Sequence, residues 1–352
     1  MLILGCRQAV RQLVLVQLFE GSNPSTPTFL LYGTYMGITD EILILSGTAN
    51  PQLSEDVVKN LGLKLGNMEI RKFADGETFV QIEETVRNKD TYVIQPTGRP
   101  SSSESWMELY CIIDALKRAS AKRITAVIPY YGYSRQDRKN EPRVPITAKL
   151  VANLLSEAGA HRVLALDLHA AQIQGFFDIP VDHMLSKNVF LDKIRKDLDM
   201  SNSIIVSPDI GGVGRARAVA KQLNLDIAII DKRRDRANEC EVMNIIGDVN
   251  GKDAIIIDDI IDTGGTLIKS MQALKKAGMR KIYVFITHAV CSGDVYERIN
   301  ASDIEKLYIT DSLKVMKDRL GSKIEVLSVA PVIADAIRHI HMELSISVLF
   351  DK

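Results

Sequence analysis

From Glu41 onward, short apolar runs alternate with segments in which apolar residues recur every three or four positions. The runs are rich in β-branched residues and are typical of buried strands, whereas the longer spacing indicates amphipathic helices. The expected strands are 42–45, 91–95, 124–129, 163–167, 204–207, 227–231, 254–257, 281–287, 306–309 and 324–328. Such alternation predicts parallel sheets with helices on both faces.

Two of the expected helices have clear apolar stripes. One stripe is formed by Leu109, Ile112, Ile113 and Leu116. The other is formed by Leu150, Val151, Leu154, Leu155 and Ala158, and Gly159 is placed to end that helix.

The strands are too numerous for one small sheet, and 352 residues exceed the usual domain length of about 100–200 residues. We therefore predict two α/β domains, an N-terminal one at 41–184 and a C-terminal one at 185–332. The last helix and strand, within 333–352, are expected to return to the first domain. Both halves place acidic or glycine-rich turns after strands, which suggests a duplicated fold.

Residues 1–40 differ from the rest in composition. The segment carries Arg7 and Arg11, has no acid before Glu20, and is turn-rich at 21–28. An arginine-bearing, acid-poor start is typical of a targeting segment. The interpretation we favour is an extension outside the fold, with the fold beginning near 41–46 and Met36 as the start of the protein.

Composition excludes several classes of protein. Lys+Arg and Asp+Glu are both 44, so no bulk charge favours a nucleic-acid or membrane partner. The four cysteines are scattered without metal-ligand spacing, as expected of reduced thiols in a cytoplasmic protein. No apolar run approaches the roughly 18 residues of a membrane helix.

The segment 255–266, IIIDDIIDTGGT, is the most informative in the chain. It follows an apolar strand and precedes a helical stripe of Leu267, Met271 and Leu274, which Gly278 closes. Its two glycines can bring bare backbone N–H groups and a helix N-terminus to an anion. Its carboxylates suit ribose hydroxyls or a magnesium-bound sugar phosphate. An acidic connection without function is the alternative, which the combined pattern disfavours.

Other polar segments also follow expected strands, where ligands of α/β sheets bind. The loop 130–143 contains four cations that could hold phosphates or form a solvated basic loop: Arg135, Arg138, Lys139 and Arg143. His169 and Asp209 each lie just past a strand. An imidazole with carboxylate oxygens would suit magnesium carried on a nucleotide.

The segment 231–239, DKRRDRANE, has four basic residues in the five positions 232–236 and little apolar content. Composition alone leaves two interpretations open. It could be a surface hairpin, or a lid that brings cations to phosphates during transfer.

Taken in order, the segments SGTANPQLS, FADGET, YYGYSRQDRK, DLHAAQIQGFFDIPVDH, SPDIGG, DKRRDRANE and IIIDDIIDTGGT make this sequence similar to the phosphate-activated ribose-phosphate diphosphokinases. The similarity runs from about residue 42 to residue 350, and residues 1–40 have no counterpart in it. It implies two phosphoribosyltransferase-like α/β domains, each with a mainly parallel sheet flanked by helices. The implied reaction transfers the diphosphoryl group of ATP to ribose 5-phosphate, giving 5-phosphoribosyl 1-diphosphate and AMP for nucleotide biosynthesis.

The same resemblance implies roles for individual residues. The ATP-binding residues would be Phe73, Asp75, Gly76, Glu77, Arg135 and Gln136. Ribose 5-phosphate would be held by Asp258, Asp262, Thr263, Gly264, Gly265 and Thr266. His169 and Asp209 would assist Mg²⁺ bound to ATP, and Lys232 and Arg234 would be the catalytic cations of the lid. The enzyme would be a homohexamer, activated by phosphate and inhibited by ADP.

Two other functions would explain only part of the sequence. A phosphoribosyltransferase would share only the segment 255–266 and would leave FADGET, RQDR and QIQGFFD unexplained. A catalytically silent homologue that binds active subunits would have lost the lid lysine or an intact acidic turn, and this sequence retains both.

Overall fold

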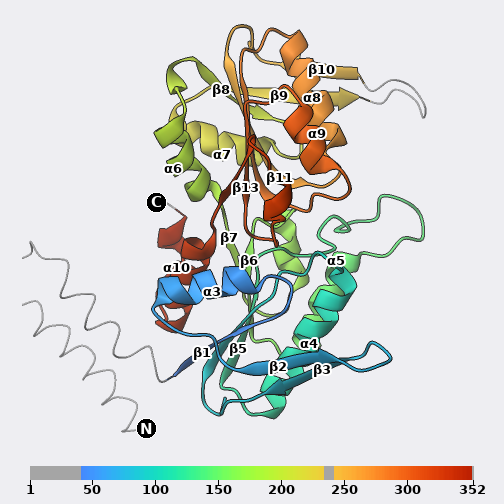
Figure 1. The fold of residues 1–352 in the computed structure, drawn as a ribbon, viewed down its shortest axis with the longest axis vertical. Coiled ribbons are helices and arrows are strands. Elements are labelled where there is room, and N and C mark those ends of the chain that lie inside the picture. The colour runs from blue at the N-terminus through green and yellow to red at the C-terminus, as the bar shows by residue number, and fades with distance from the viewer. Residues whose placement is uncertain (1–40, 234–241, 351–352) are drawn as a thin grey trace, which may run out of the picture. The chain divides into compact units, whose positions relative to one another are not determined.

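The chain forms two open, mainly parallel sheets, and helices pack beside both of them (Figure 1). The structure is a computed structural model that describes residues 41–233 and 242–350. Both sheets belong to one compact unit, Ile42–Lys352. The α/β class and the mainly parallel sheets expected from the sequence are confirmed, whereas the exact domain limits stay a prediction.

The first sheet has the strand order β1-β4-β5-β6-β7, and every neighbouring pair is parallel. Its strands are β1 (Ile42–Ser46), β4 (Asp90–Ile94), β5 (Arg123–Ile128), β6 (Arg162–Leu166) and β7 (Val181–Met184). Its connections contain α3 (Pro51–Leu61), α4 (Ser102–Arg118), α5 (Thr147–Ala158) and the 3-10 helix η1 (Ala171–Phe176). The predicted stripe of α4 is fully buried against the sheet, whereas Leu150 and Leu154 of α5 are exposed.

A separate antiparallel ribbon consists of β2 (Met68–Lys72) and β3 (Thr78–Ile82). Alternate residues of these strands, including Ile70 and Val80, pack against the core of the first sheet. The opposite face carries Glu69, Arg71 and Gln81 together with Phe79, over whose ring the Arg71 guanidinium lies at 4.0 Å. The turn of the ribbon carries the residues of the FADGET segment.

The second sheet has the order β10-β9-β8-β11-β12-β13-β14, and only the β9–β10 pair is antiparallel. Its strands are β8 (Ser203–Ser207), β9 (Ile227–Arg233), β10 (Val242–Ile246), β11 (Asp253–Ile261), β12 (Ile282–Ala289), β13 (Lys306–Thr310) and β14 (Ile324–Leu327). The helices that accompany it are α6 (Lys187–Asp197), α7 (Val213–Leu223), α8 (Gly265–Lys276) and α9 (Val295–Ala301).

Helices cover both faces of the centre of this sheet. Successive side chains of a strand point to opposite faces, so both sets of side chains in the middle of a central strand are buried, which favours apolar residues. Ala254 and Ile256 of β11 belong to the cluster that contains residues of α8 and α9. Ile255 and Ile257 belong to the opposite cluster, which contains residues of α6 and α7. An uninterrupted apolar run is therefore required here, and this explains why the apolar part of the strand, 254–257, was predicted correctly.

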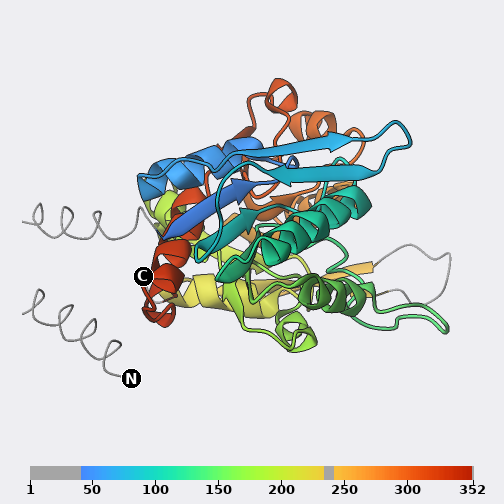
Figure 2. The ribbon, with the colours of Figure 1, turned by 90° about the horizontal axis from the view of Figure 1, so that it is seen from below.

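The last helix, α10 (Ala330–His341), returns to the first sheet and lies beside α3 (Figures 1 and 2). His341 bonds to Asp90 at the start of β4, with 2.8 Å between Nδ1 and Oδ2. Arg123 of β5 donates to the carbonyl of Ile340 at 3.1 Å. The strand expected after this helix is wrong, because the chain instead forms a short 3-10 helix, Ser347–Leu349.

Several boundaries also differ from prediction. The strands β2, β3, β7 and β10 were not expected, and all four are at sheet edges or in the ribbon, where apolar runs are short. The strand β11 continues to Ile261 because its pairing with β12 continues through Ile261 and Ala289. Asp258 therefore lies within a strand and not in a turn. Among the described residues, no helix is both long and apolar enough to cross a membrane.

Candidate active site

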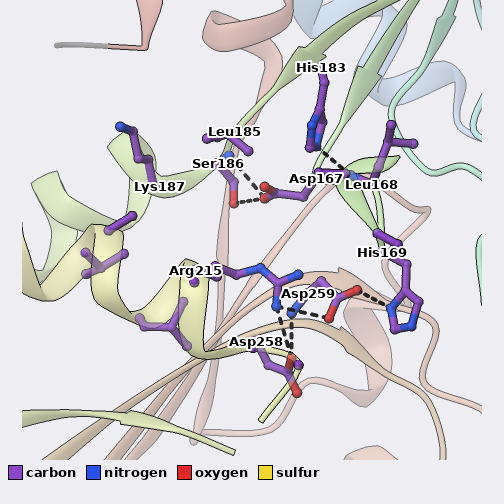
Figure 3. A pocket seen from close by; sticks show the side chains of 18 of the residues that line it. Asp167, Leu168, His169, His183, Leu185, Ser186, Lys187, Arg215, Asp258 and Asp259 are labelled. Atoms are coloured by element: carbon purple, nitrogen blue, oxygen red, sulfur yellow. Dashed lines mark hydrogen bonds and ion pairs between the residues drawn. The ribbon is translucent and has the colours of Figure 1, made fainter. Parts of the chain in front are cut away.

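A cavity of about 700 Å³ opens at the ends of β6 and β8 and beside β11, and the residues that line it come from segments that accompany both sheets. His169 enters it from the segment after β6, and Asp209 from the turn after β8. Arg215 extends from the first turns of α7 toward Asp258 and Asp259 of β11 (Figure 3). Such a position, at the carboxyl ends of parallel strands, is where α/β proteins bind ligands.

Arg215 is the central cation of this cavity. Its Nη1 lies 3.1 Å from Asp259 Oδ1 and 3.3 Å from Asp258 Oδ1. Burial alone would lower the pKa of Arg215, but the surrounding carboxylates, Asp259 first, raise it. The guanidinium therefore offsets the repulsion between two adjacent acids in a partly dehydrated place.

His169, in the segment after β6, contacts one acid of this pair, Asp259. Its Nδ1 lies 2.7 Å from Asp259 Oδ2, and this hydrogen bond raises the pKa of the imidazole although burial opposes it. With Nδ1 occupied by Asp259, Nε2 is the ring nitrogen that can meet a ligand. Asp259 thus joins Arg215 of the second sheet to His169 of the first sheet (Figure 3).

The two acids have pKa values shifted in opposite directions. Burial and the charge of Asp259 raise the pKa of Asp258. Burial also acts to raise the pKa of Asp259, but the hydrogen bond with His169 and the charge of Arg215 lower it overall. The backbone N–H of Asp259 donates to Asp258 Oδ1 at 2.9 Å. Separated pKa values in a neighbouring pair are typical of functional sites.

Asp167 joins the two sheets at the back of the cavity. It is 5% exposed, and its Oδ2 accepts hydrogen bonds from Thr287 Oγ1 at 2.6 Å, from the backbone of Ser186 at 3.1 Å and from the Ser186 hydroxyl. Its carbonyl bonds to His288 Nε2 at 3.0 Å. Burial lowers the pKa of His288 and so disfavours the charged ring.

The turn after β8 is held by its own polar groups. Asp209 Oδ1 accepts from the backbone N–H of Gly212 at 2.8 Å, and Ser207 Oγ donates to the Asp209 carbonyl at 2.7 Å. A Cβ atom on Gly212 would lie 3.0 Å from Ser207 Oγ, so the turn is tight enough to favour glycine. Gly212 is also the N-cap of α7, which places a helix N-terminus beside the cavity.

The segment after β11 makes a tight turn into α8. Gly264 has a φ of 71°, in the left-handed region that favours glycine, and α8 begins at Gly265. Arg298 Nη1 donates to the Thr263 carbonyl at 2.9 Å and so supports the turn from α9. The free backbone N–H groups of the first helical turn make this a suitable phosphate site.

Asp262 connects this turn with the first sheet. Its Oδ2 lies 2.8 Å from Arg135 Nη1, while its Oδ1 is buried without a hydrogen-bond partner. Burial would raise the pKa of Asp262, but hydrogen bonds from Ser292 and Arg135 lower it overall. An ionised carboxylate with one unpaired oxygen can accept a hydrogen bond from a ligand hydroxyl.

The FADGET residues lie apart from the cavity, at the tip of the β2–β3 ribbon. The backbone N–H of Phe73 donates to the Glu77 carbonyl at 2.9 Å, and Asp75 Oδ1 accepts from the Glu77 N–H at 3.1 Å. Gly76 has a φ of 94°, as such a turn requires. The Phe73 ring is 45% exposed, and the guanidinium of Arg71 lies 5.0 Å from its centre.

Comparison with known proteins agrees with these features. Residues 42–159 match the family described as the N-terminal domain of ribose phosphate pyrophosphokinase. Residues 234–351 match the phosphoribosyl synthetase-associated domain. A ribose-phosphate pyrophosphokinase of Campylobacter jejuni is 54% identical over 307 residues, which cover 87% of this chain and 98% of that protein. The chain belongs to the ribose-phosphate pyrophosphokinase family.

Further relatives support the same assignment. The ribose-phosphate pyrophosphokinase of Agrobacterium fabrum is 50% identical over 309 residues, covering 88% of this chain and 99% of that protein. The crystal structure of phosphoribosylpyrophosphate synthetase from Mycobacterium smegmatis is similar with a TM-score of 0.82 and 38% identity. That comparison covers 86% of this chain and 100% of the other. The resemblance inferred from the sequence is confirmed.

Within this chain, the predicted residues lie in several separate places. His169, Asp209 and Asp258 line the cavity. Arg135 and Asp262 meet between the two sheets, and Gln136 Oε1 accepts from Thr147 Oγ1 at 2.5 Å. The backbone of Lys232 lies in β9, paired with Met243, so the strand is longer than expected. Arg234 lies outside the described residues, as does the extension 1–40.

Among the polar residues of the cavity that sequence reasoning missed are Asp167, Arg215 and Asp259. Asp259 follows the predicted Asp258 directly, and the doublet itself was a usable signal. Asp167 ends the expected strand 163–167, two positions before His169. Arg215 gave no signal, because an arginine in the first turns of an amphipathic helix is ordinary. Its importance arises only from the packing of α7 against β11.

Proposed function

We propose that this chain is an active ribose-phosphate diphosphokinase. It transfers the diphosphoryl group of ATP to the anomeric hydroxyl of ribose 5-phosphate, and the products are 5-phosphoribosyl 1-diphosphate and AMP. The observation that carries this function is 54% identity over 98% of the length of a ribose-phosphate pyrophosphokinase. The intact acidic doublet and the tight turn into α8 add structural support.

Ribose 5-phosphate is assigned to the end of β11 and the turn that follows. The 5-phosphate would bind at Thr263–Thr266, where hydroxyl groups and the first N–H groups of α8 offer donors. The unpaired Oδ1 of Asp262 would accept from a ribose hydroxyl, which would remove a buried unsatisfied atom. Asp258 would accept from a second hydroxyl.

ATP is assigned to the first sheet and the ribbon. Arg135 and Gln136 would bind its phosphates and base, and Phe73, Asp75, Gly76 and Glu77 would hold the adenine end. Because the ribbon tip is exposed and does not line the cavity, we assign its contact to the ATP of a neighbouring subunit. A homohexamer with phosphate as activator and ADP as inhibitor is the assembly that the family resemblance implies.

The metal is assigned to His169 and Asp209. Among the described residues, no group of three or more His, Cys, Asp or Glu side chains is arranged to hold a metal by itself. This arrangement fits Mg²⁺, which binds one or two protein oxygens together with substrate phosphates. When bound, Mg²⁺ would neutralise charge on the transferring phosphates.

The protein's own contribution is to position the reactants and neutralise charge, which supply most of the catalysis in phosphoryl-type transfer. Arg215 and the proposed lid cations Lys232 and Arg234 would supply positive charge near the phosphates. The acid pair Asp258–Asp259 would orient the sugar and, through Asp259, the imidazole of His169. No protein nucleophile is required by this reaction.

A direct assay tests the function. Purified protein with ATP, Mg²⁺ and ribose 5-phosphate should release AMP together with a new diphosphoryl sugar, both followed by ³¹P NMR. Without ribose 5-phosphate, AMP should not form, which distinguishes transfer from ATP hydrolysis. Absence of product, with the Campylobacter jejuni relative active in parallel, would favour the catalytically silent homologue.

The metal assignment makes a separate prediction. His169→Ala and Asp209→Ala should each raise the Mg²⁺ concentration for half-maximal rate by about tenfold or more, because a ligand of the metal is lost. Magnesium titrations of the initial rate would measure the shift.

Asp226→Ala is the matched control, since this exposed acid directly precedes β9 and does not line the cavity. Its titration should coincide with that of the unaltered enzyme. Unchanged titrations for both His169→Ala and Asp209→Ala, in folded protein, would refute a metal role.

A further inference from the structure

Arg99 makes a contact between the two sheets that neither the sequence motifs nor the proposed roles explain. It follows β4 in the first sheet, yet its Nη1 donates to the carbonyls of Val290 at 2.9 Å and Cys291 at 2.5 Å. Val290 and Cys291 directly follow β12 of the second sheet. A guanidinium that donates to two backbone carbonyls fixes the path of that segment.

The segment held by Arg99 also holds the beginning of the ribose 5-phosphate turn. The N–H of Cys291 donates to the Ile261 carbonyl at 3.1 Å, and the N–H of Ser292 donates to the Asp262 carbonyl at 3.1 Å. A displacement of residues 290–292 would therefore move Asp262 and the turn that follows it.

Asp262 closes the path back to the first sheet through its pair with Arg135. The loop that leads to Arg135 begins at Tyr130, whose carbonyl accepts from both the N–H and the hydroxyl of Thr97 at 2.9 Å. Thr97 lies two residues before Arg99. These hydrogen bonds, together with the short chain segments 97–99 and 130–135, form a closed ring. The ring runs from Arg99 to residues 290–292, on to Asp262 and Arg135, and back to Arg99.

The two sheets approach closely beside this ring. Tyr130, Val290 and Leu313 form a buried apolar cluster between them. A Cβ atom on Gly98 would lie 2.5 Å from Leu313 Cδ2, so the loop before Arg99 has no room to shift toward the second sheet. The hydrogen-bonded ring and this apolar cluster together fix the position of residues 97–99 relative to residues 290–292.

We infer that Arg99 is a positioning residue, which sets the ribose 5-phosphate turn relative to the ATP-side loop that carries Arg135. It touches no substrate in this assignment and acts through Val290, Cys291 and Asp262. The inference rests on the proposed function, because it concerns the geometry between the two substrates. In-line transfer is sensitive to such geometry, and a displacement of about 1 Å can cost about a hundredfold in rate.

Replacement of Arg99 by Met tests the inference, because Met keeps an unbranched side chain and removes the donors. We expect the KM for ribose 5-phosphate to rise about fivefold to tenfold and kcat to fall about tenfold, as expected for a misplaced rather than a missing contact. Arg99→Lys should bring both constants to within about threefold of the unaltered enzyme, since an ammonium can donate to both carbonyls.

Hydrogen exchange supplies a readout that does not depend on activity. In Arg99→Met, the amides of Cys291 and Ser292 should exchange faster, while those of α4 remain unchanged. Arg118→Met is the matched control: its side chain is 78% exposed and pairs with Asp114 within α4. Its kinetic constants and exchange should equal those of the unaltered enzyme. If Arg99→Met fails to fold, Arg99→Gln is measured in its place.

The outcomes separate the two hypotheses. If the unaltered protein forms no AMP, the proposed function fails. If it is active, and Arg99→Met keeps its kinetic constants, the inference about Arg99 is overturned. It is also overturned if exchange rises throughout the fold and Arg99→Lys restores nothing, because Arg99 would then serve only stability. A kinetic change with local exchange at residues 290–292, corrected by lysine, supports it.

Discussion

Lys232→Ala is expected to lower kcat by about two to four orders of magnitude, the scale of losing a preorganised charge in a closed site. The reason is the density of cations at 232–236, which composition alone assigns either to a lid or to a solvated hairpin. Catalysis of diphosphoryl transfer depends on neutralising charge on the transferring group. The KM for ribose 5-phosphate should change much less, because that ligand is assigned to the turn at Thr263–Thr266.

Steady-state kinetics with both substrates varied would measure this effect. Arg234→Ala should act in the same direction and more mildly, since Arg233 and Arg236 can substitute for it in part. Lys221→Ala is the control, because this exposed lysine at the end of α7 belongs to the same sheet and to neither substrate site. A nearly unaltered kcat for Lys232→Ala, or an effect on KM alone, would show that the segment is a solvated hairpin.

The strands of the sheet centres could be predicted from sequence because burial on two faces demands an uninterrupted apolar run, as at Ala254–Ile257. The ribbon strands β2 and β3 escaped prediction for the opposite reason. Only one face of each is covered, so apolar and charged residues alternate, as Ile70 and Arg71 do. The end of β11 was misplaced because carboxylates are typical of turns, whereas pairing with β12 holds Asp258 in the strand.

The candidate site divides in the same way. Residues of the contiguous turn Asp262–Thr266 could be assigned because glycine and threonine after a strand have a local meaning. The link between His169 and Asp259 could not, since 90 residues separate them and only the packing of the two sheets brings them together. Arg99 is a similar case: its partners lie more than 190 residues away, on backbone carbonyls that leave no trace in side-chain identity.

Arg215→Met is expected to destabilise the fold by about 3–5 kcal/mol, the usual cost of removing one partner from a buried ion pair. Asp258 and Asp259 would then repel each other without the nearby guanidinium. The rate should fall by about a hundredfold or more in protein that remains folded, because the cavity loses its central cation. Urea unfolding and steady-state kinetics would measure the two effects, and Arg217→Met, on the exposed side of α7, is the control.

The loss of stability should also depend on pH. Because burial and the charge of Asp259 raise the pKa of Asp258, this carboxyl favours the folded state fully below its unfolded pKa of about 3.9. That contribution to stability is lost as pH rises through the pKa of Asp258 in the folded state. Without Arg215, ionising both Asp258 and Asp259 destabilises the folded state further. The pKa of Asp259 is lowered, so its own titration lies below this window. The deficit of Arg215→Met relative to the unaltered enzyme should therefore be smaller near about pH 5 than near about pH 8. An equal deficit at both values would mean that Arg215 stabilises the fold by packing alone, and that the acid pair does not depend on its charge.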